Sequence, residues 1–146
     1  MCLSLRKLSL EASAPPDFTP QTYGGGLEPA NGVADEDGPV MVTVEYQIDP
    51  ARAAAFAEVM QRTRRARLRQ GALSWGLFRD AAQPGRVIEY FVDENWVEHQ
   101  RRLERFSAFD AGLREERLAF HLSEEAPRVK RYIGQSLGAL GDLGKR

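Results

Sequence analysis

Residues 40–50 read VMVTVEYQIDP, and this stretch decides the fold. Every second residue in its first nine positions is β-branched or aromatic, which predicts a β-strand with one buried face. Asp49 is a good helix N-cap and Pro50 suits the first helical position, so a helix should follow directly. We expect this helix to run to about Gln70, because Gly71 favours termination there.

Two further alternating stretches follow this helix. Residues 73–80 and 87–93 each place apolar side chains at every second position. Residues 81–85 read AAQPG between them, and the Pro-Gly pair favours a turn. The two stretches are therefore expected to form an antiparallel hairpin.

Two helices and a last strand are predicted after the hairpin. Asn95 followed by Glu98 resembles a capping box at a helix start. Ser107 is the cap of a second helix, which we expect to run to about His121. Residues 127–133 alternate again and predict a final strand, either central in the sheet or at a dimer seam.

The element order β-α-β-β-α-α-β predicts the fold class. It is typical of an α+β, ferredoxin-like fold, a four-stranded antiparallel sheet with helices on one face. The other face would carry Trp75, Leu77, Glu89 and Phe91, or their alternates, and is too apolar to be left in water. We therefore expect a homodimer in which two sheets pack together as a dimeric α/β barrel around a cavity.

The ordered domain is expected to be shorter than the chain of 146 residues. Residues 1–38 are rich in proline and glycine and carry an acidic run, a composition typical of a disordered arm or linker. Residues 39–133 contain all of the periodic stretches and form the predicted domain. Residues 134–146 are rich in glycine and are expected to be a flexible tail.

Composition excludes several functional classes. A net charge of −1 with 28% charged residues gives no basic surplus for nucleic acid or anionic membranes. The single cysteine, Cys2, permits no disulfide within the chain and favours a reducing compartment. There is no signal-peptide pattern and no stretch of ~18 apolar residues. We expect a cytoplasmic location, at the inner face of the membrane if the chain is tied to a transporter.

Four segments carry a family resemblance. Residues 44–50 (VEYQIDP), 75–80 (WGLFRD), 89–92 (EYFV) and 96–99 (WVEH) resemble the bacterial antibiotic biosynthesis monooxygenase (ABM) domain. More narrowly, they are similar to the soluble C-terminal domain of efflux transporters of the major facilitator superfamily (MFS), of the enterobactin-exporter-like group. The resemblance covers residues 39–133. A membrane domain precedes this module in those transporters and has no counterpart here, which is consistent with a free-standing relative, a shortened product or a fragment.

The resemblance implies a dimeric barrel with a pocket between sheet and helices. Some members of the family oxidise aromatic polyketides with dioxygen and without metal, flavin or haem. Others degrade haem with a histidine ligand and nearby asparagine and tryptophan. Asn95, Trp96 and His99 lie together at one helix start, unlike the dispersed residues of the haem enzymes, so we expect neither haem nor any other cofactor.

His99 is the leading catalytic candidate. An imidazole can gain and lose a proton near neutral pH, and the first turn of a helix disfavours its charged form. His99 could therefore act as a base. The alternative is a structural histidine that packs on Trp96 and bonds to a backbone carbonyl.

The candidate ligand-binding residues are Trp75, Arg79, Glu89, Phe91 and Trp96. The two tryptophans could stack on an aromatic ligand, although such positions more often belong to a core or a dimer seam. Arg79 and Glu89 are expected on the same side of their strands as the apolar residues. They therefore either bind a polar group of a ligand or form a cross-strand ion pair.

Two other clusters carry weaker signals. The arginines of residues 62–69 spread around several helix faces without aromatic residues between them, so no nucleic-acid partner is expected. His121 with Glu124 and Glu125 has too few ligands at metal-binding spacing, and no metal site is predicted.

Two functional hypotheses remain open. The first is an accessory domain, related to transporter modules, that binds an amphipathic or aromatic small molecule. The second is a cofactor-independent monooxygenase for aromatic, polyketide-like substrates, with His99 as the base and Trp75 and Trp96 as walls. The sequence leaves enzymatic activity undecided.

Overall fold

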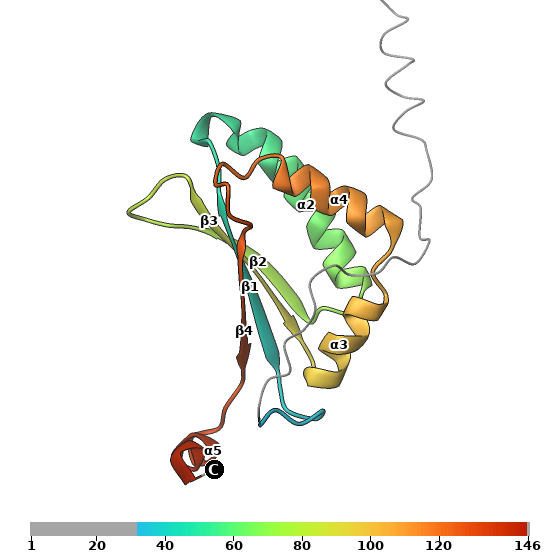
Figure 1. The fold of residues 1–146 in the computed structure, drawn as a ribbon, viewed down its shortest axis with the longest axis vertical. Helices are drawn as coiled ribbons and strands as arrows, with labels where there is room; N and C mark the ends of the chain where they lie inside the picture. Colours follow the sequence, from blue (N-terminus) through green and yellow to red (C-terminus); the bar gives the residue numbers. More distant parts are fainter. Residues whose placement is uncertain (1–31, 146) are drawn as a thin grey trace, which may run out of the picture.

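A four-stranded antiparallel sheet covered by helices on one face forms the body of the protein in a computed structural model, which describes residues 32–145 (Figure 1). The strands are β1 (Val40–Gln47), β2 (Ser74–Arg79), β3 (Arg86–Asp93) and β4 (Arg128–Ile133). The helices are α2 (Ala53–Arg69), α3 (Trp96–Glu104), α4 (Ala108–Leu118) and α5 (Leu137–Gly141), and the 3₁₀ turns are η1 (Pro50–Arg52) and η2 (Leu143–Lys145). The predicted ferredoxin-like α+β fold is confirmed.

The strands lie in the order β2-β3-β1-β4. β2 and β3 form the expected antiparallel hairpin, with Trp75 opposite Phe91. β4 pairs with β1 alone and is an edge strand, so the alternative that placed it at the centre of the sheet is wrong. The centre is occupied by β1 and β3, whose alternating residues are the most deeply buried of the four strands.

The helices begin at the residues that the sequence indicates. The Asp49 side chain accepts a hydrogen bond from the amide of Ala51, although the first turn is 3₁₀ before α2 begins. The Asn95 side chain accepts from the amide of Glu98 at the start of α3. Ser107 and Asp110 form a complete capping box at the start of α4.

The main core lies between the sheet and helices α2 and α4. The inward side chains of β1 pack against Phe56 and Met60 of α2 and Leu113 of α4. Tyr46 and Phe120 each stack edge-to-face on Phe56, with ring centroids 5.4 and 5.5 Å away. A second cluster joins Val40, Val42 and Phe91 to Trp96.

The helices cover the face that carries Trp75, Leu77, Glu89 and Phe91. Of the two alternatives left open by the sequence, the second therefore holds, and the alternates of these residues lie on the uncovered face. The uncovered face carries the aromatic and aliphatic residues Met41, Phe78, Ile88, Tyr90 and Tyr132, of which Phe78 is 61% exposed. The ring of Tyr90 lies over Gly76, where a Cβ would overlap it.

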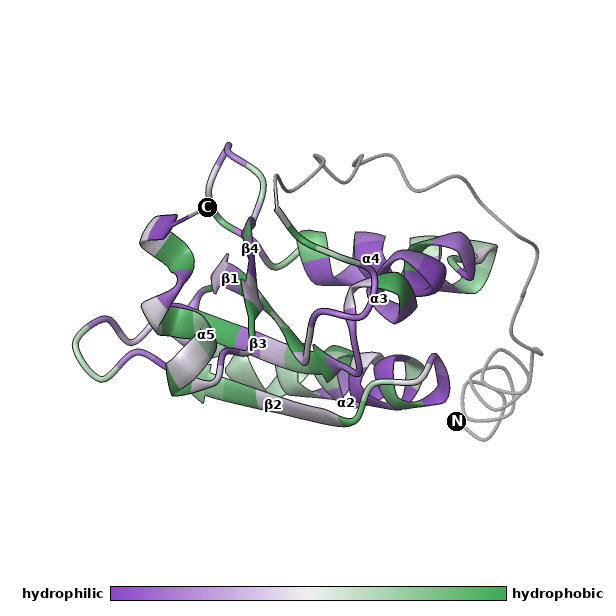
Figure 2. Cartoon of the chain, turned by 90° about the horizontal axis from the view of Figure 1, so that it is seen from below, coloured by the Kyte–Doolittle hydropathy of each residue, from purple (hydrophilic) through white to green (hydrophobic). Residues whose placement is uncertain are grey.

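Helix α5 follows β4 beyond the end of the sheet (Figure 1). It is mostly apolar, whereas α2, α3 and α4 carry many hydrophilic residues (Figure 2). Leu137 and Leu140 are 89% and 52% exposed. The proposed domain limits stay a prediction, and residues 1–31 of the predicted arm lie outside the described residues.

The described helices include none that could serve as a transmembrane segment, since each is too short or too polar to cross a bilayer.

Candidate functional site

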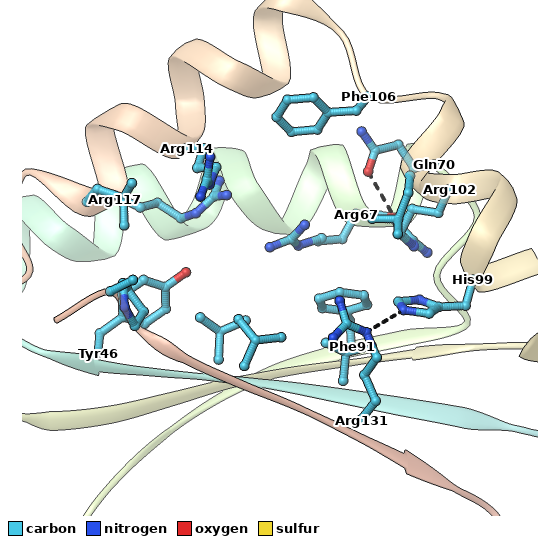
Figure 3. Close-up of a pocket in the computed structure, with 17 residues that line it drawn as sticks. Tyr46, Arg67, Gln70, Phe91, His99, Arg102, Phe106, Arg114, Arg117 and Arg131 are labelled. Carbon is cyan, nitrogen blue, oxygen red and sulfur yellow. Dashed lines mark hydrogen bonds between the residues drawn. The ribbon is translucent and has the colours of Figure 1, made fainter. Parts of the chain in front are cut away.

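A cavity of about 110 Å³ lies between the sheet and the helices. Its floor is apolar and comes from Val42, Val44 and Phe91 on the two central strands. Leu103 and Phe106, at the C-terminal end of α3 and just after it, close another side. Figure 3 shows the strands below the cavity and the helices above it, with long polar side chains reaching in from the helices.

Five arginines line this cavity: Arg67 from α2, Arg102 from α3, Arg114 and Arg117 from α4, and Arg131 from β4. Within residues 32–145, no acidic side chain lines it. The cavity therefore combines an apolar floor with cationic walls.

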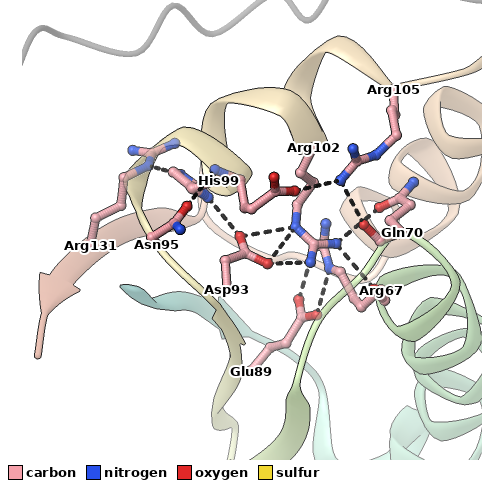
Figure 4. A network of polar contacts seen from close by, with 10 residues as sticks. Arg67, Gln70, Glu89, Asp93, Asn95, His99, Arg102, Arg105 and Arg131 are labelled. Atoms are coloured by element: carbon pink, nitrogen blue, oxygen red, sulfur yellow. Dashed lines mark hydrogen bonds and ion pairs between the residues drawn. The ribbon is translucent and has the colours of Figure 1, made fainter. Parts of the chain in front are cut away.

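His99 is 2% exposed and lies between two charged partners (Figure 4). Its Nδ1 is 2.8 Å from Asp93 Oδ2, and its Nε2 is 2.9 Å from Arg131 Nε. A guanidinium can only donate, so Nε2 must accept and Nδ1 must carry the proton that it donates to Asp93. The geometry thus describes a neutral imidazole whose basic nitrogen is covered by Arg131.

Asp93, at the end of β3, also holds Arg102. Arg102 Nε donates to both carboxylate oxygens at 2.9 and 3.0 Å, and Arg102 Nη2 donates to Oδ1 as well. Burial by itself would raise the pKa of Asp93, but His99 and Arg102 together hold it below its usual range. Asp93 is therefore an anion that orients both neighbours.

Glu89 is fully buried in the middle of β3 and accepts hydrogen bonds from a second set of donors. Arg67 Nε lies 3.0 Å and Trp75 Nε1 2.8 Å from Glu89 Oε2, and the Tyr46 hydroxyl donates to Oε1 at 3.3 Å. Burial would raise the pKa of Glu89, but the charge of Arg67, with help from Arg117 and Trp75, keeps it below its ordinary value. Burial and the Glu89 charge raise the pKa of Tyr46, which therefore stays protonated.

Arg117 is 7% exposed and donates to Thr63 Oγ1 at 3.2 Å and to the Tyr46 oxygen. Within the described part of the chain it forms no salt bridge, because the nearby Glu89 is paired with Arg67. Burial, together with the charge of Arg67, lowers the pKa of the Arg117 guanidinium.

Five of the six candidate residues fall into two groups in the structure. His99 and Phe91 line the cavity. Trp75, Glu89 and Trp96 lie behind its wall: Trp75 donates to Glu89, and the Trp96 ring lies 5.5 Å from the ring of His99.

Arg79 ends β2 and is exposed. Its cross-strand partner is Val87, so the ion pair considered between Arg79 and Glu89 does not form, and Glu89 pairs with Arg67.

The sequence reasoning missed the arginines and the partner of His99. A signal was present, because Arg102, Arg117 and Arg131 stand at positions where the helix or strand period requires a core-facing residue. Arg131 lies between Val129 and Ile133 on the inward side of β4, for example. Arg67 belongs to the arginine series of α2 but turns inward to Glu89.

His121 has a structural role on β1. Its Nδ1 accepts from the amide of Gln47 at 3.0 Å, and its Nε2 lies 2.9 Å from the carbonyl oxygen of Glu125. Within residues 32–145, no three His, Cys, Asp or Glu side chains gather as a metal ion would require.

Comparison with protein-family models matches residues 7–137 to the family described as "Transmembrane secretion effector". No curated protein matches the chain.

Solved structures share the fold. A protein from Bordetella bronchiseptica, provisionally named an antibiotic biosynthesis monooxygenase, is 22% identical with a TM-score of 0.56, covering 68% of this chain and 99% of its own. A similarly named protein from Caulobacter crescentus is 15% identical with a TM-score of 0.56, covering 69% and 93%. A variant of SnoaB, a cofactor-independent oxygenase from Streptomyces nogalater, is 17% identical with a TM-score of 0.51, covering 71% and 95%. At these identities the likeness establishes an ABM-type fold.

Proposed function

The chain belongs to the transmembrane secretion effector family, and from this premise we propose that it is a small-molecule-binding accessory domain of ABM type, related to the soluble C-terminal module of MFS efflux transporters. The observation that carries the proposal is the cavity between the sheet and helices α2, α3 and α4, with its apolar floor and polar walls. Such a combination suits a small amphipathic ligand, since the floor supplies burial and the walls supply orientation.

The size of the cavity favours binding over polyketide chemistry. Its volume of about 110 Å³ is below the ~300 Å³ at which ligand pockets for drug-sized molecules begin. An apolar cavity of ~150 Å³ admits a benzene ring, so a single ring or a short chain is the scale that fits with little adjustment. A fused polyketide would need a larger opening.

The binding proposal is tested by blocking the entrance. Ala126 and Val129 are exposed and line the cavity, so they mark the side on which it reaches solvent. We expect p-cresol to shift amide resonances of cavity residues in a ¹H–¹⁵N titration, and Ala126→Trp to abolish these shifts. Ala119→Trp, at an exposed alanine outside the cavity lining, is the matched control and should bind like the wild type.

Two results would contradict the proposal. One is p-cresol shifts that are scattered over the surface. The other is binding that survives unchanged in Ala126→Trp while that variant keeps the wild-type spectrum elsewhere.

A cofactor-independent monooxygenase is the second candidate, and the Asp93–His99 pair is the observation that favours it. Asp93 accepts the proton of Nδ1, so Nε2 is the nitrogen available to act as a base. In that reaction Nε2 would remove a phenolic or enolic proton, and the carbanion form of the substrate would reduce dioxygen. Arg131 covers Nε2, so it would have to move before proton abstraction.

Oxygen uptake distinguishes the enzyme from the accessory domain. The substrates are 1-naphthol and anthrone, and His99→Ala is the control. Uptake by the wild type that is lost in His99→Ala supports the enzyme. Equal uptake in both proteins removes the monooxygenase hypothesis for these substrates.

The family assignment also supports a membrane transporter as the partner of this domain. A reading frame for such a transporter beside, or continuous with, this one would support that pairing. An unrelated neighbourhood, together with no binding to the transporters of the same cell, would count against it.

A further inference from the structure

The arginines around the cavity are unequally neutralised. Glu89 is bonded to Arg67 and Asp93 to Arg102, whereas Asp110, a third buried carboxylate, accepts hydrogen bonds from Ser107. Arg117 and Arg131 form no salt bridge within residues 32–145. Arg117 donates to Thr63 and Tyr46, and Arg131 donates to His99. At Arg117 the cavity wall therefore carries a buried positive charge that no salt bridge of the described residues compensates.

Arg117 is the more deeply buried of the two arginines that form no salt bridge. A buried ion is costly unless an opposite charge and hydrogen bonds accompany it. Arg117 is 7% exposed, and the hydroxyl groups of Thr63 and Tyr46 give it hydrogen bonds but no charge. Its guanidinium has five N–H donors in a planar fork, so these two contacts leave donors for a ligand in the cavity that it lines.

The apolar floor limits what the ligand can be. A bare inorganic anion would leave Val42, Val44 and Phe91 in contact with empty space or water. An organic carboxylate would cover this floor with its hydrocarbon part and place two oxygens against a guanidinium, the geometry that favours a bidentate pair.

We propose that the ligand of this cavity is a small organic carboxylate with a single ring or short apolar body, held through its carboxylate by Arg117. This inference rests on the proposed function, because it names the chemical class of the molecule bound. Figure 3 shows Arg117 and Arg114 reaching from α4 toward the cavity that Tyr46 and Phe91 border from the strands. The carboxylate would supply the charge that Arg117 lacks, and the ring would lie on Phe91 and the two valines.

The test compares benzoate with benzamide, which have nearly the same shape but differ in charge. Both are titrated into the full-length ¹⁵N-labelled chain, and the Nε–Hε signals of the arginines are followed. We expect benzoate to bind at least about tenfold more tightly than benzamide and to shift the Arg117 signal, because charge-assisted hydrogen bonds are about twice as strong as neutral ones.

Two variants locate the carboxylate. Arg117→Met keeps much of the side-chain volume and should reduce the preference for benzoate to less than about threefold. Arg65→Gln removes an exposed arginine of α2 that does not line the cavity, and it should keep the full preference. If Arg117→Met does not fold, the Arg117 Nε–Hε shift in the wild type decides the question by itself.

The outcomes distinguish a failure of this inference from a failure of the proposed function. Equal affinity for benzoate and benzamide at the cavity overturns the carboxylate preference and leaves small-molecule binding intact. Benzoate binding that leaves the Arg117 signal unmoved overturns the assignment of the anchor. If benzoate, benzamide and p-cresol all fail to bind, the proposed function fails together with the inference.

Discussion

At the scale of the residue, the interior of this domain contains ionised side chains. Asp93 and Glu89 are 2% and 0% exposed, yet each is ionised because arginines and hydrogen-bond donors surround it. Breaking such a buried pair is far more costly than breaking an exposed one, because the remaining charge is left in an apolar setting. These residues hold the walls of the cavity in position while leaving Arg117 without a partner of opposite charge.

The stability of the protein should fall at acidic pH because of these two carboxylates. Their pKa values are lowered in the fold, so their contribution is complete above the ordinary values of 4.5 for Glu89 and 3.8 for Asp93. It is lost as the pH falls through the lower folded values, because the unfolded chain binds more protons. Urea unfolding from about pH 6 to about pH 3 should show this fall.

Glu89→Gln identifies one source of the pH dependence. Without that carboxyl group, the free energy of unfolding should depend less steeply on pH, by up to about 1.4 kcal/mol per pH unit. Glu116→Gln removes an exposed carboxylate that pairs with Arg62 and should change the slope little. The same slope in the wild type and Glu89→Gln would show that Glu89 does not contribute.

At the scale of the element, the start of α3 places two residues of the site. Asn95 caps this helix through a 2.9 Å bond from the amide of Glu98, and His99 and Arg102 follow on the side that faces Asp93. The cap thus sets the helix register that brings both side chains to one carboxylate. This arrangement links a local sequence signal to the geometry of the cavity.

Removing the cap should weaken the protein moderately. Asn95→Ala is expected to lower the free energy of unfolding by about 1 kcal/mol, since the amide of Glu98 loses its acceptor. Asn95→Asp retains an acceptor and should stay close to the wild type. Urea unfolding at neutral pH measures both, and an equal loss in the two variants would argue that the cap is not the cause.

At the scale of the whole molecule, the two faces of the sheet differ. Three helices cover one face (Figure 1), while the other presents Phe78 and Tyr90 as neighbouring rings with centroids 5.7 Å apart. Phe78 is 61% exposed, and Met41 and Tyr132 are exposed on the same face. Large apolar patches of this kind favour association, and a two-fold dimer would cover both copies at once.

Phe78→Asp should therefore weaken dimer formation. We expect sedimentation to show a dimer for the wild type and a monomer for Phe78→Asp at the same concentration, because a charge would be buried in the interface. Leu68→Asp introduces the same charge on α2, which covers the opposite face, and should remain dimeric. A wild-type monomer at high concentration would contradict the dimer proposal.

The sequence by itself determined the elements and their order. Alternation in residues 40–48 and 87–93, the Pro-Gly turn and the caps at Asp49, Asn95 and Ser107 are local signals, because period and capping depend on neighbours a few residues apart. They were sufficient for the ferredoxin-like fold. They also identified His99 and Phe91, which both line the cavity.

Only the tertiary structure decided which face of the sheet the helices cover and which charges meet there. The alternation of residues along the strands predicts that Trp75 and Phe91 lie on the same face of the sheet. It does not predict whether the helices cover that face. The contacts of His99 with Arg131 and of Arg117 with Thr63 span 32 and 54 residues, so no local pattern encodes them. Arginine is usually found at the surface, and only the packing of α4 over the sheet and the pairing of β4 with β1 place these side chains around a shared cavity.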